Sequence, residues 1–193
     1  MTAVYILAGL FLTLAALWIL VPALYGLPSV PTYPDRIRAA LRLADLKPGE
    51  AFYDLGCGDG RTLVIAAKEF GAKSTGIEIG PVQCLVSWGN ALRNGVSHNA
   101  CAGRSRSIRV KRGNFYRADV SAADVVFVYA TSRELIRLQA HLASQLRAGA
   151  RLVTVGSDFP DWEPVKMDRV NLLFLYAMPP QYQCTVEPAN MLT

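Results

Sequence analysis

The stretch Asp54-Leu55-Gly56-Cys57-Gly58-Asp59-Gly60 ends a short apolar run and carries a glycine at every second position. A glycine-rich turn between a strand and a helix lets the backbone approach a ligand closely, because glycine has no side chain and accepts positive φ. Such turns usually hold a pyrophosphate at the helix N-terminus. Here Asp54 and Asp59 place two carboxylates in the turn, which would repel a pyrophosphate and attract a cation. The turn therefore predicts a cationic nucleoside cofactor.

The spacing of the glycines also excludes the usual dinucleotide-binding turn. In the pattern G-x-G-x-x-G the last glycine would fall on Arg61. The pattern present is D-x-G-x-G-x-G, which resembles motif I of class I methyltransferases. Their cofactor, S-adenosylmethionine, carries an ammonium and a sulfonium but no phosphate. The sequence therefore predicts S-adenosylmethionine as the cofactor, held in part by the residues Asp54, Gly56, Cys57, Gly58, Asp59 and Gly60.

Short apolar runs alternate with amphipathic stretches along the rest of the chain, which is typical of a parallel sheet with crossover helices. The runs predict strands at 51–55, 74–79, 108–112, 124–129 and 150–156, and helices at 34–44, 61–70, 82–93 and 134–146. Residues 165–167 and 171–177 predict a closing antiparallel hairpin. The expected fold is α/β, a Rossmann-like seven-stranded methyltransferase sheet with an antiparallel terminal hairpin.

Polar side chains lie at the carboxyl ends of the predicted strands, where open parallel sheets bind their ligands. Glu78 ends the second strand, 24 residues after Asp54, the usual distance for a carboxylate that accepts hydrogen bonds from both ribose hydroxyls. A solvated acid at a helix start is the alternative. Since Glu78 lies inside an apolar strand end, the ribose role is favoured.

Three further residues are candidates for the cofactor site. Asn114 stands where methyltransferases often have an acid that contacts the adenine amino group, and its carbonyl oxygen can accept a hydrogen bond in the same way. Phe115 either packs on the adenine face or belongs to the core. Arg61 opposes the positive end of the helix that it begins, so it either binds the cofactor carboxylate or forms a salt bridge.

The segment Val128-Tyr129-Ala130-Thr131-Ser132 follows the fourth strand, where the methyl acceptor enters. It has no N-P-P-Y or D-P-P-Y pattern, which grips planar amides and exocyclic amines, and no Pro-Cys nucleophile for pyrimidine chemistry. The absence of these motifs favours an amine as the methyl acceptor. A lysine amine needs no strong base here, because burial and a nearby cation lower its pKa from the usual value of about 10.4. Tyr129 is the candidate catalytic residue that orients this amine, and Tyr33 is a second; a core or interface tyrosine is the alternative.

The N-terminal run, residues 3–21, contains no charged side chain and is long enough to span a bilayer. It predicts a transmembrane anchor over 1–26, a linker over 27–33 and a methyltransferase domain over 34–193. A cleaved signal peptide is disfavoured because no basic residue precedes the run, and a buried core helix because the run is apolar all round.

The flanking charges and the thiols indicate the compartment. The basic residues Arg36, Arg38 and Arg42 follow the run closely. They predict a single-pass protein of the cell membrane with a cytoplasmic catalytic domain. The four cysteines form no C-x-x-C pair and are expected to be reduced. His98 and His141 lie far apart in the sequence, so no metal site is expected.

Taken in order, these pieces resemble the lysine methyltransferase family that includes the mitochondrial ATP synthase c-subunit methyltransferase and small archaeal protein lysine methyltransferases. The resemblance covers residues 28–178 and rests on five segments: Val30-Pro31-Thr32, Asp54 to Arg61, Gly76 to Gly80, the stretch that leads into Arg133-Glu134, and Ser157 to Trp162. It implies cofactor contacts at Pro31 and Thr32, and a membrane segment as in several members. The chain departs from the family at Cys57, where serine is common, and at Asn114, where aspartate is common.

The leading hypothesis is a membrane-anchored enzyme that methylates a lysine of a membrane-associated protein. The alternatives are methylation of a small or lipid-like molecule and a non-catalytic cofactor-binding scaffold. The net charge is +5, and one basic cluster consists of Arg104, Arg106, Arg109, Lys111 and Arg112. Both features raise nucleic acid as a partner. No aromatic interrupts this cluster, so a solvated face or attraction to anionic lipid is the simpler account, and nucleic acid is not the expected partner.

Overall fold

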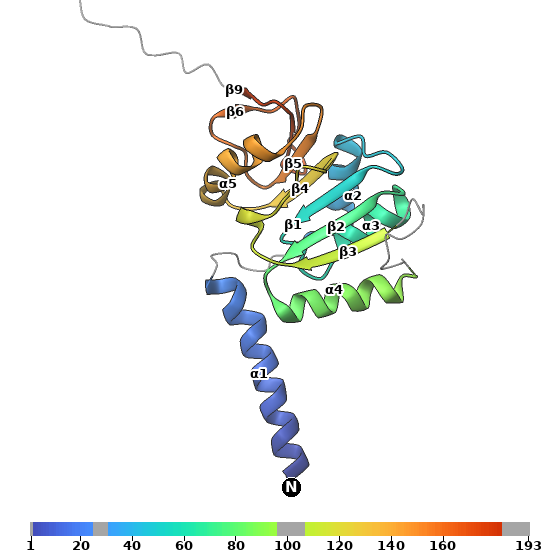
Figure 1. Ribbon diagram of the computed structural model, residues 1–193, viewed down its shortest axis with the longest axis vertical. Coiled ribbons are helices and arrows are strands. Elements are labelled where there is room, and N and C mark those ends of the chain that lie inside the picture. The colour runs from blue at the N-terminus through green and yellow to red at the C-terminus, as the bar shows by residue number, and fades with distance from the viewer. Residues whose placement is uncertain (1, 25–30, 96–106, 183–193) are drawn as a thin grey trace, which may run out of the picture.

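The computed structural model describes residues 2–24, 31–95 and 107–182. Its centre is a seven-stranded sheet in the order β3-β2-β1-β4-β5-β8-β7 (Figure 1). The strands are β1 (Ala51–Leu55), β2 (Lys73–Glu78), β3 (Ser107–Arg112), β4 (Val125–Tyr129), β5 (Arg151–Val155), β7 (Lys166–Asp168) and β8 (Leu173–Ala177). The first five pair in parallel, whereas β8 pairs antiparallel with both β5 and β7. The expected Rossmann-like sheet with its antiparallel hairpin is confirmed.

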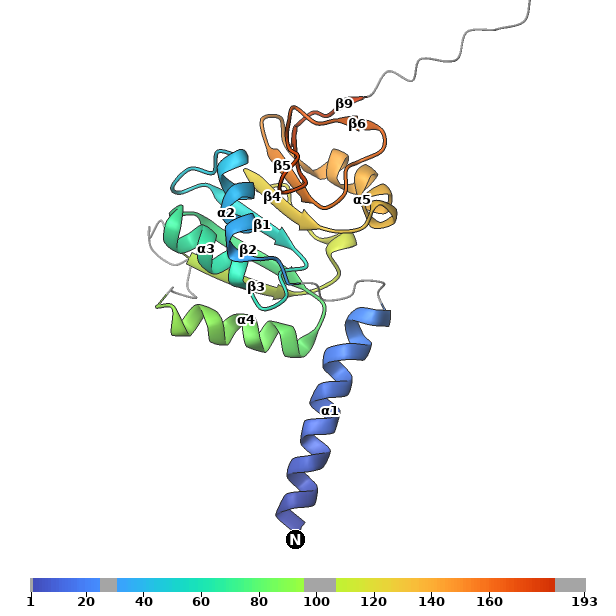
Figure 2. The same cartoon turned by 180° about the vertical axis from the view of Figure 1, so that it is seen from behind.

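Helices cover both faces of the sheet, as Figures 1 and 2 show. One face packs on α2 (Pro34–Leu43), α3 (Arg61–Glu69) and α4 (Pro81–Arg93), and the other on α5 (Ser132–Gln145) and the short 3-10 helix η1 (Phe115–Arg117). In β4, Val125 and Phe127 belong to the first core and Val126 and Val128 to the second. This explains why the strand is apolar throughout: both of its faces are buried.

Most elements begin and end within a residue or two of their predicted positions. Helix α5 begins earlier than predicted because Thr131 and Glu134 form a capping box, in which each side chain binds the backbone N–H of the other. An additional two-stranded sheet pairs β6 (Trp162–Glu163) with β9 (Gln181–Tyr182). The sequence does not predict this small sheet, because two residues per strand are too few to show the alternation of polar and apolar side chains.

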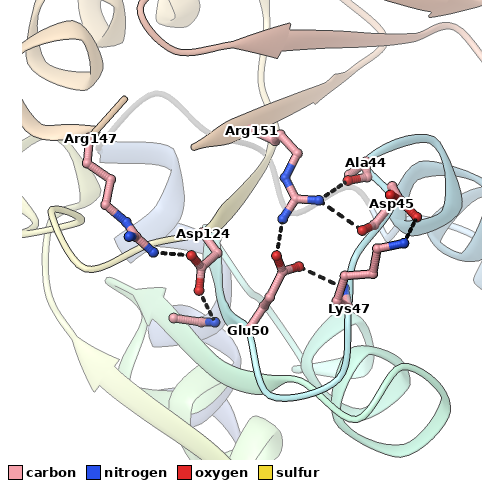
Figure 3. A network of polar contacts seen from close by, with 8 residues as sticks. Ala44, Asp45, Lys47, Glu50, Asp124, Arg147 and Arg151 are labelled. Atoms are coloured by element: carbon pink, nitrogen blue, oxygen red, sulfur yellow. Dashed lines mark hydrogen bonds and ion pairs between the residues drawn. The ribbon is translucent and has the colours of Figure 1, made fainter. Parts of the chain in front are cut away.

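The amino ends of the central strands are tied together by a network of charged groups (Figure 3). Arg151 of β5 donates to the carbonyls of Ala44 and Asp45, each at 2.8 Å, and pairs with the carboxylate of Glu50. Beside it, Asp124 pairs with Arg147 and accepts the N–H of Ala51. The network joins the loop after α2 to the entry of β1, β4 and β5, at the end of the sheet opposite to the strand ends predicted to bind the cofactor.

The N-terminal run forms helix α1 (Thr2–Leu24), which points away from the sheet (Figure 1). In the part of the chain that the structure describes, no helix meets the length and apolarity that crossing a membrane requires. The prediction of a single-pass membrane protein with a cytoplasmic catalytic domain is therefore wrong. Most of the predicted linker, residues 27–30, lies outside the described residues.

Candidate cofactor site

A cavity of about 620 Å³ opens at the carboxyl ends of β1, β2 and β4. The strand order reverses between β1 and β4, so the cavity lies at the topological switch point, where open α/β sheets bind ligands. Its volume is in the usual range for small-molecule sites. Of the fourteen residues that the sequence analysis names as site candidates, Tyr33, Gly60 and Asn114 do not line it, and eleven do: Pro31, Thr32, Asp54, Gly56, Cys57, Gly58, Asp59, Arg61, Glu78, Phe115 and Tyr129.

The glycine turn has the backbone that its sequence requires. Gly56, Gly58 and Gly60 have φ values of 88°, 54° and 75°, a region that side chains make costly. At Gly60 a Cβ would also lie 2.1 Å from the Ser87 hydroxyl of α4. Gly60 does not line the cavity itself; it lets α3 begin close to α4 and so holds the turn in place.

Glu78 at the end of β2 is 7% exposed and fixes two turns with one carboxylate. Oε2 accepts the N–H of Gly58 at 2.9 Å, and Oε1 accepts the N–H of Gly80 at 2.8 Å. Each oxygen retains a lone pair that can accept a hydroxyl. This preorganised carboxylate suits the predicted ribose contact.

Asp54 at the end of β1 is 3% exposed. Burial raises the pKa of its carboxyl to about 8, and the charges of Glu78 and Asp59 act in the same direction, while a hydrogen bond with Thr62 opposes the shift. A cation bound in the cavity would stabilise the carboxylate and offset this cost. The buried carboxylate therefore suits S-adenosylmethionine, whose ammonium and sulfonium groups are both positive.

Asp59 differs from Asp54 because its charge is already paired. The guanidinium of Arg61 donates to both oxygens of Asp59, with Nη2 at 2.6 Å from Oδ2 and Nε at 3.0 Å from Oδ1. Of the two roles left open for Arg61, the structure shows the salt bridge. The two carboxylates of the turn are thus unequal, and Asp54 is the one without a positive partner in the described part of the chain.

Asn114 does not line the cavity. Its Oδ1 accepts the N–H of Tyr116 at 2.9 Å and so caps the 3-10 helix η1. The amide oxygen meant for adenine is therefore used within its own turn. The adenine contact of Asn114 stays a prediction, whereas the neighbouring Phe115 lies at the cavity wall and is 5% exposed.

The cavity has further wall residues to which the sequence analysis gave no individual role, among them Trp18, Gln83, Thr131, Glu134, Gly156 and Ser157. The capping-box spacing of Thr131 and Glu134 was a readable signal for the start of α5 and hence for this part of the wall. No comparable signal exists for Trp18, because its neighbour Gln83 lies 65 positions away in the sequence.

Tyr129 lies at the cavity wall beside Gly156, where a Cβ would come within 3.2 Å of the Tyr129 ring. The guanidinium carbon of Arg36 lies 5.7 Å from the ring centroid, and Arg36 Nε donates to the Asn171 carbonyl at 2.7 Å. These contacts fix the ring between α2 and the loop after β5. Within residues 2–24, 31–95 and 107–182 no three His, Cys, Asp or Glu side chains gather as metal ligands would.

This fold and this site define a class I methyltransferase that uses S-adenosylmethionine. The model of the ANTKMT methyltransferase domain matches residues 54–166, and the chain belongs to this family. The expected family resemblance is thereby confirmed.

Two curated relatives place the chain more closely. The protein-lysine N-methyltransferase of Saccharolobus islandicus is 32% identical over 144 residues, 74% of this chain and 84% of that protein. The ATP synthase c-subunit lysine N-methyltransferase of Xenopus laevis is 28% identical over 138 residues, 72% of this chain. The match covers 57% of the length of the frog protein.

A solved structure shares the whole domain. The RNA methyltransferase from Salinibacter ruber, in complex with S-adenosyl-L-homocysteine, is 28% identical and superposes with a TM-score of 0.71. The match covers 85% of this chain and 100% of that one. The sheet and its cofactor end are therefore common to both proteins.

Proposed function

We propose that this chain transfers a methyl group from S-adenosylmethionine to the side-chain amine of a lysine in a protein. The archaeal and frog relatives, both named as lysine N-methyltransferases, support this acceptor. The observation that carries the proposal is a buried carboxylate that lines the same cavity as Tyr129.

That carboxylate belongs to Glu134, which is 5% exposed and lines the cavity. Its Oε2 accepts the N–H of Thr131 at 2.8 Å and the Thr131 hydroxyl at 2.9 Å. These two bonds hold the side chain in one position, and no described residue donates to Oε1. An arriving lysine is an ammonium, so a fixed carboxylate attracts and orients it.

The amine must lose a proton before it can react, because only the neutral nitrogen has a free electron pair. Bound S-adenosylmethionine supplies an activated methyl group on a positive sulfur. Tyr129 and Glu134 hold the amine; the carboxylate of Glu134 favours its ammonium form, whereas the exclusion of water by apolar wall residues and the positive sulfur favour the neutral form. The nitrogen would then form a bond to the methyl carbon while the bond from that carbon to the sulfonium sulfur breaks, so that S-adenosylhomocysteine leaves as a neutral thioether and the methylated ammonium gives up its excess proton on return to solvent.

The test uses the full chain with isotope-labelled S-adenosylmethionine and a cell extract that is afterwards separated into protein, lipid and RNA. We expect label in protein, at lysine after hydrolysis. A Glu78→Ala variant, which lacks the carboxylate predicted to bind the ribose, serves as the blank and is expected to transfer no label. Label in lipid or RNA with none in protein would overturn the proposal.

RNA methylation is the second candidate, because the Salinibacter ruber structure is described as an RNA methyltransferase. Three basic residues of the basic cluster are exposed on the edge strand β3: Arg109, Lys111 and Arg112. Arg104 and Arg106 lie outside the described residues. A positive edge alone suits any polyanion, so the amine-binding end of the cavity favours lysine, and the RNA fraction of the same experiment decides between them.

A further inference from the structure

One wall of the cofactor cavity comes from helix α1, which lies outside the sheet and its covering helices. Trp18 lines the cavity, and α1 contacts α4. Figures 1 and 2 show the C-terminal end of α1 beside the N-terminal end of α4. Helix α1 therefore reaches the site that binds the cofactor.

Gln83 of α4 connects the two helices. Its Nε2 donates to the backbone carbonyl of Trp18 at 3.0 Å. In a regular helix this carbonyl would accept the N–H of residue 22, but residue 22 is proline and has none. Gln83 thus supplies the donor that α1 lacks. Because a carbonyl only accepts, the amide nitrogen must face Trp18, and this fixes the position of the amide oxygen.

That oxygen, Oε1 of Gln83, is buried and has no hydrogen-bond partner among the described residues. Gln83 is 1% exposed and lines the cavity. A Cβ on Gly80 would lie 2.0 Å from Oε1, so the oxygen rests against Gly80, whose N–H binds Glu78 at 2.8 Å. Two acceptors, Glu78 and Gln83, therefore lie close together, and the second costs free energy until a donor reaches it.

We propose that Gln83 binds the cofactor and couples it to helix α1. Oε1 accepts a hydrogen bond from one ribose hydroxyl of the adenosyl group, beside Glu78, while Nε2 holds Trp18 at the cavity wall. A ribose has two neighbouring hydroxyls, which suits two neighbouring acceptors. Because both bonds use one side chain, cofactor binding stabilises the packing of α1 on α4, and the packed helix in turn strengthens cofactor binding by the same factor.

The first test measures binding of S-adenosylhomocysteine to the full chain by calorimetry. Gln83→Met keeps the volume and loses both hydrogen bonds, so the Kd is expected to rise about five- to tenfold. The matched control is Gln139→Met, since Gln139 of α5 donates to Asp161 outside the cavity, and its Kd is expected to equal that of the native chain. Equal binding by the native chain and Gln83→Met overturns the contact.

Cofactor analogues separate a direct contact from a structural effect of the substitution. The native chain is expected to bind one of the two analogues, 2′-deoxy- or 3′-deoxy-S-adenosylhomocysteine, about fivefold more weakly than the parent through loss of the Gln83 bond. In Gln83→Met that part of the loss disappears. If each analogue loses the same factor on both proteins, Gln83 does not bind a hydroxyl.

Hydrogen exchange tests the coupling itself. S-adenosylhomocysteine is expected to slow amide exchange in residues 2–24 of the native chain and of Gln139→Met, but not in Gln83→Met. Unchanged exchange in α1 of the native chain on ligand binding overturns the coupling. None of these measurements requires methyl transfer, so their outcome is independent of which acceptor the enzyme uses.

Discussion

Among the carboxyl groups of the cavity, that of Asp54 has the largest shift in pKa. Because it is buried, its carboxylate form needs a positive charge nearby to be stable. Its carboxyl has a pKa raised to about 8, chiefly by burial. The protonated form, which prevails below pH 8, attracts a cation less than the carboxylate does. With Asp54 as the predicted cofactor contact, the cofactor and the proton compete for one group.

This competition predicts that S-adenosylmethionine binds more tightly as pH rises toward 8, by up to about tenfold per pH unit, and levels off above it. Titration calorimetry at several pH values measures the profile. The Asp54→Asn variant cannot ionise there, so its profile reports the titration of the ligand alone. A native profile parallel to that of Asp54→Asn would contradict the role of Asp54.

Glu134 allows a clean separation of structure from charge, because glutamine also completes a capping box. Glu134→Gln is expected to keep the thermal stability and the Kd for S-adenosylhomocysteine, and to raise the KM for a lysine acceptor about tenfold, since a charged hydrogen bond contributes about 1.5–3 kcal/mol. Steady-state kinetics with a methylatable peptide measure this. An unchanged KM would leave Glu134 as a helix cap only.

At the scale of elements, the charged network of Figure 3 joins the amino ends of the strands, and none of its residues lines the cavity. The side chains of Arg151 and Glu50 are 21% and 23% exposed, whereas Arg147 is 57% exposed. Arg151 also donates to two carbonyls of the loop after α2. The two arginines should therefore differ in their contribution to stability.

Arg151→Met is expected to lower the free energy of unfolding by about 2 kcal/mol, because it removes the cation paired with the Glu50 carboxylate and leaves two carbonyls without donors. Arg147→Met is expected to cost less than about 1 kcal/mol, as exposed ion pairs do. Urea unfolding measures both. Equal losses would contradict this ranking, and a change in cofactor Kd would contradict the separation of network and site.

The elements also show which features a sequence can predict. Local spacing and strand ends suffice to place the glycine turn and Glu78 at the cavity. Asn114 was assigned to adenine, yet a short polar side chain after a strand can equally cap its own turn, and spacing does not distinguish the two. The contact between Gln83 and Trp18 depends on tertiary packing across 65 positions. For α1, the apolar run predicts a membrane span, which the described helix does not bear out.

For the whole molecule, the buried acid of the cavity lowers the stability of the free protein. The pKa of Asp54 is 3.8 in an ordinary environment and about 8 in the fold, so between these values the folded state binds more protons than the unfolded one. Stability therefore falls as pH rises from about 4 to 8 through this group. A bound cation reverses the effect, because it favours the carboxylate.

Two consequences follow for thermal unfolding of the full chain. Asp54→Asn is expected to melt above the native protein, by a margin that grows from pH 5 to pH 8, although it binds the cofactor poorly. S-adenosylmethionine at 100 times its Kd is expected to add about 2.7 kcal/mol to the native protein, which for a chain of this size raises Tm by about 5–11 °C. Calorimetry with and without ligand measures both. A margin that is constant with pH would show that Asp54 is ionised in the free protein, and the cavity would then attract its cation at every physiological pH.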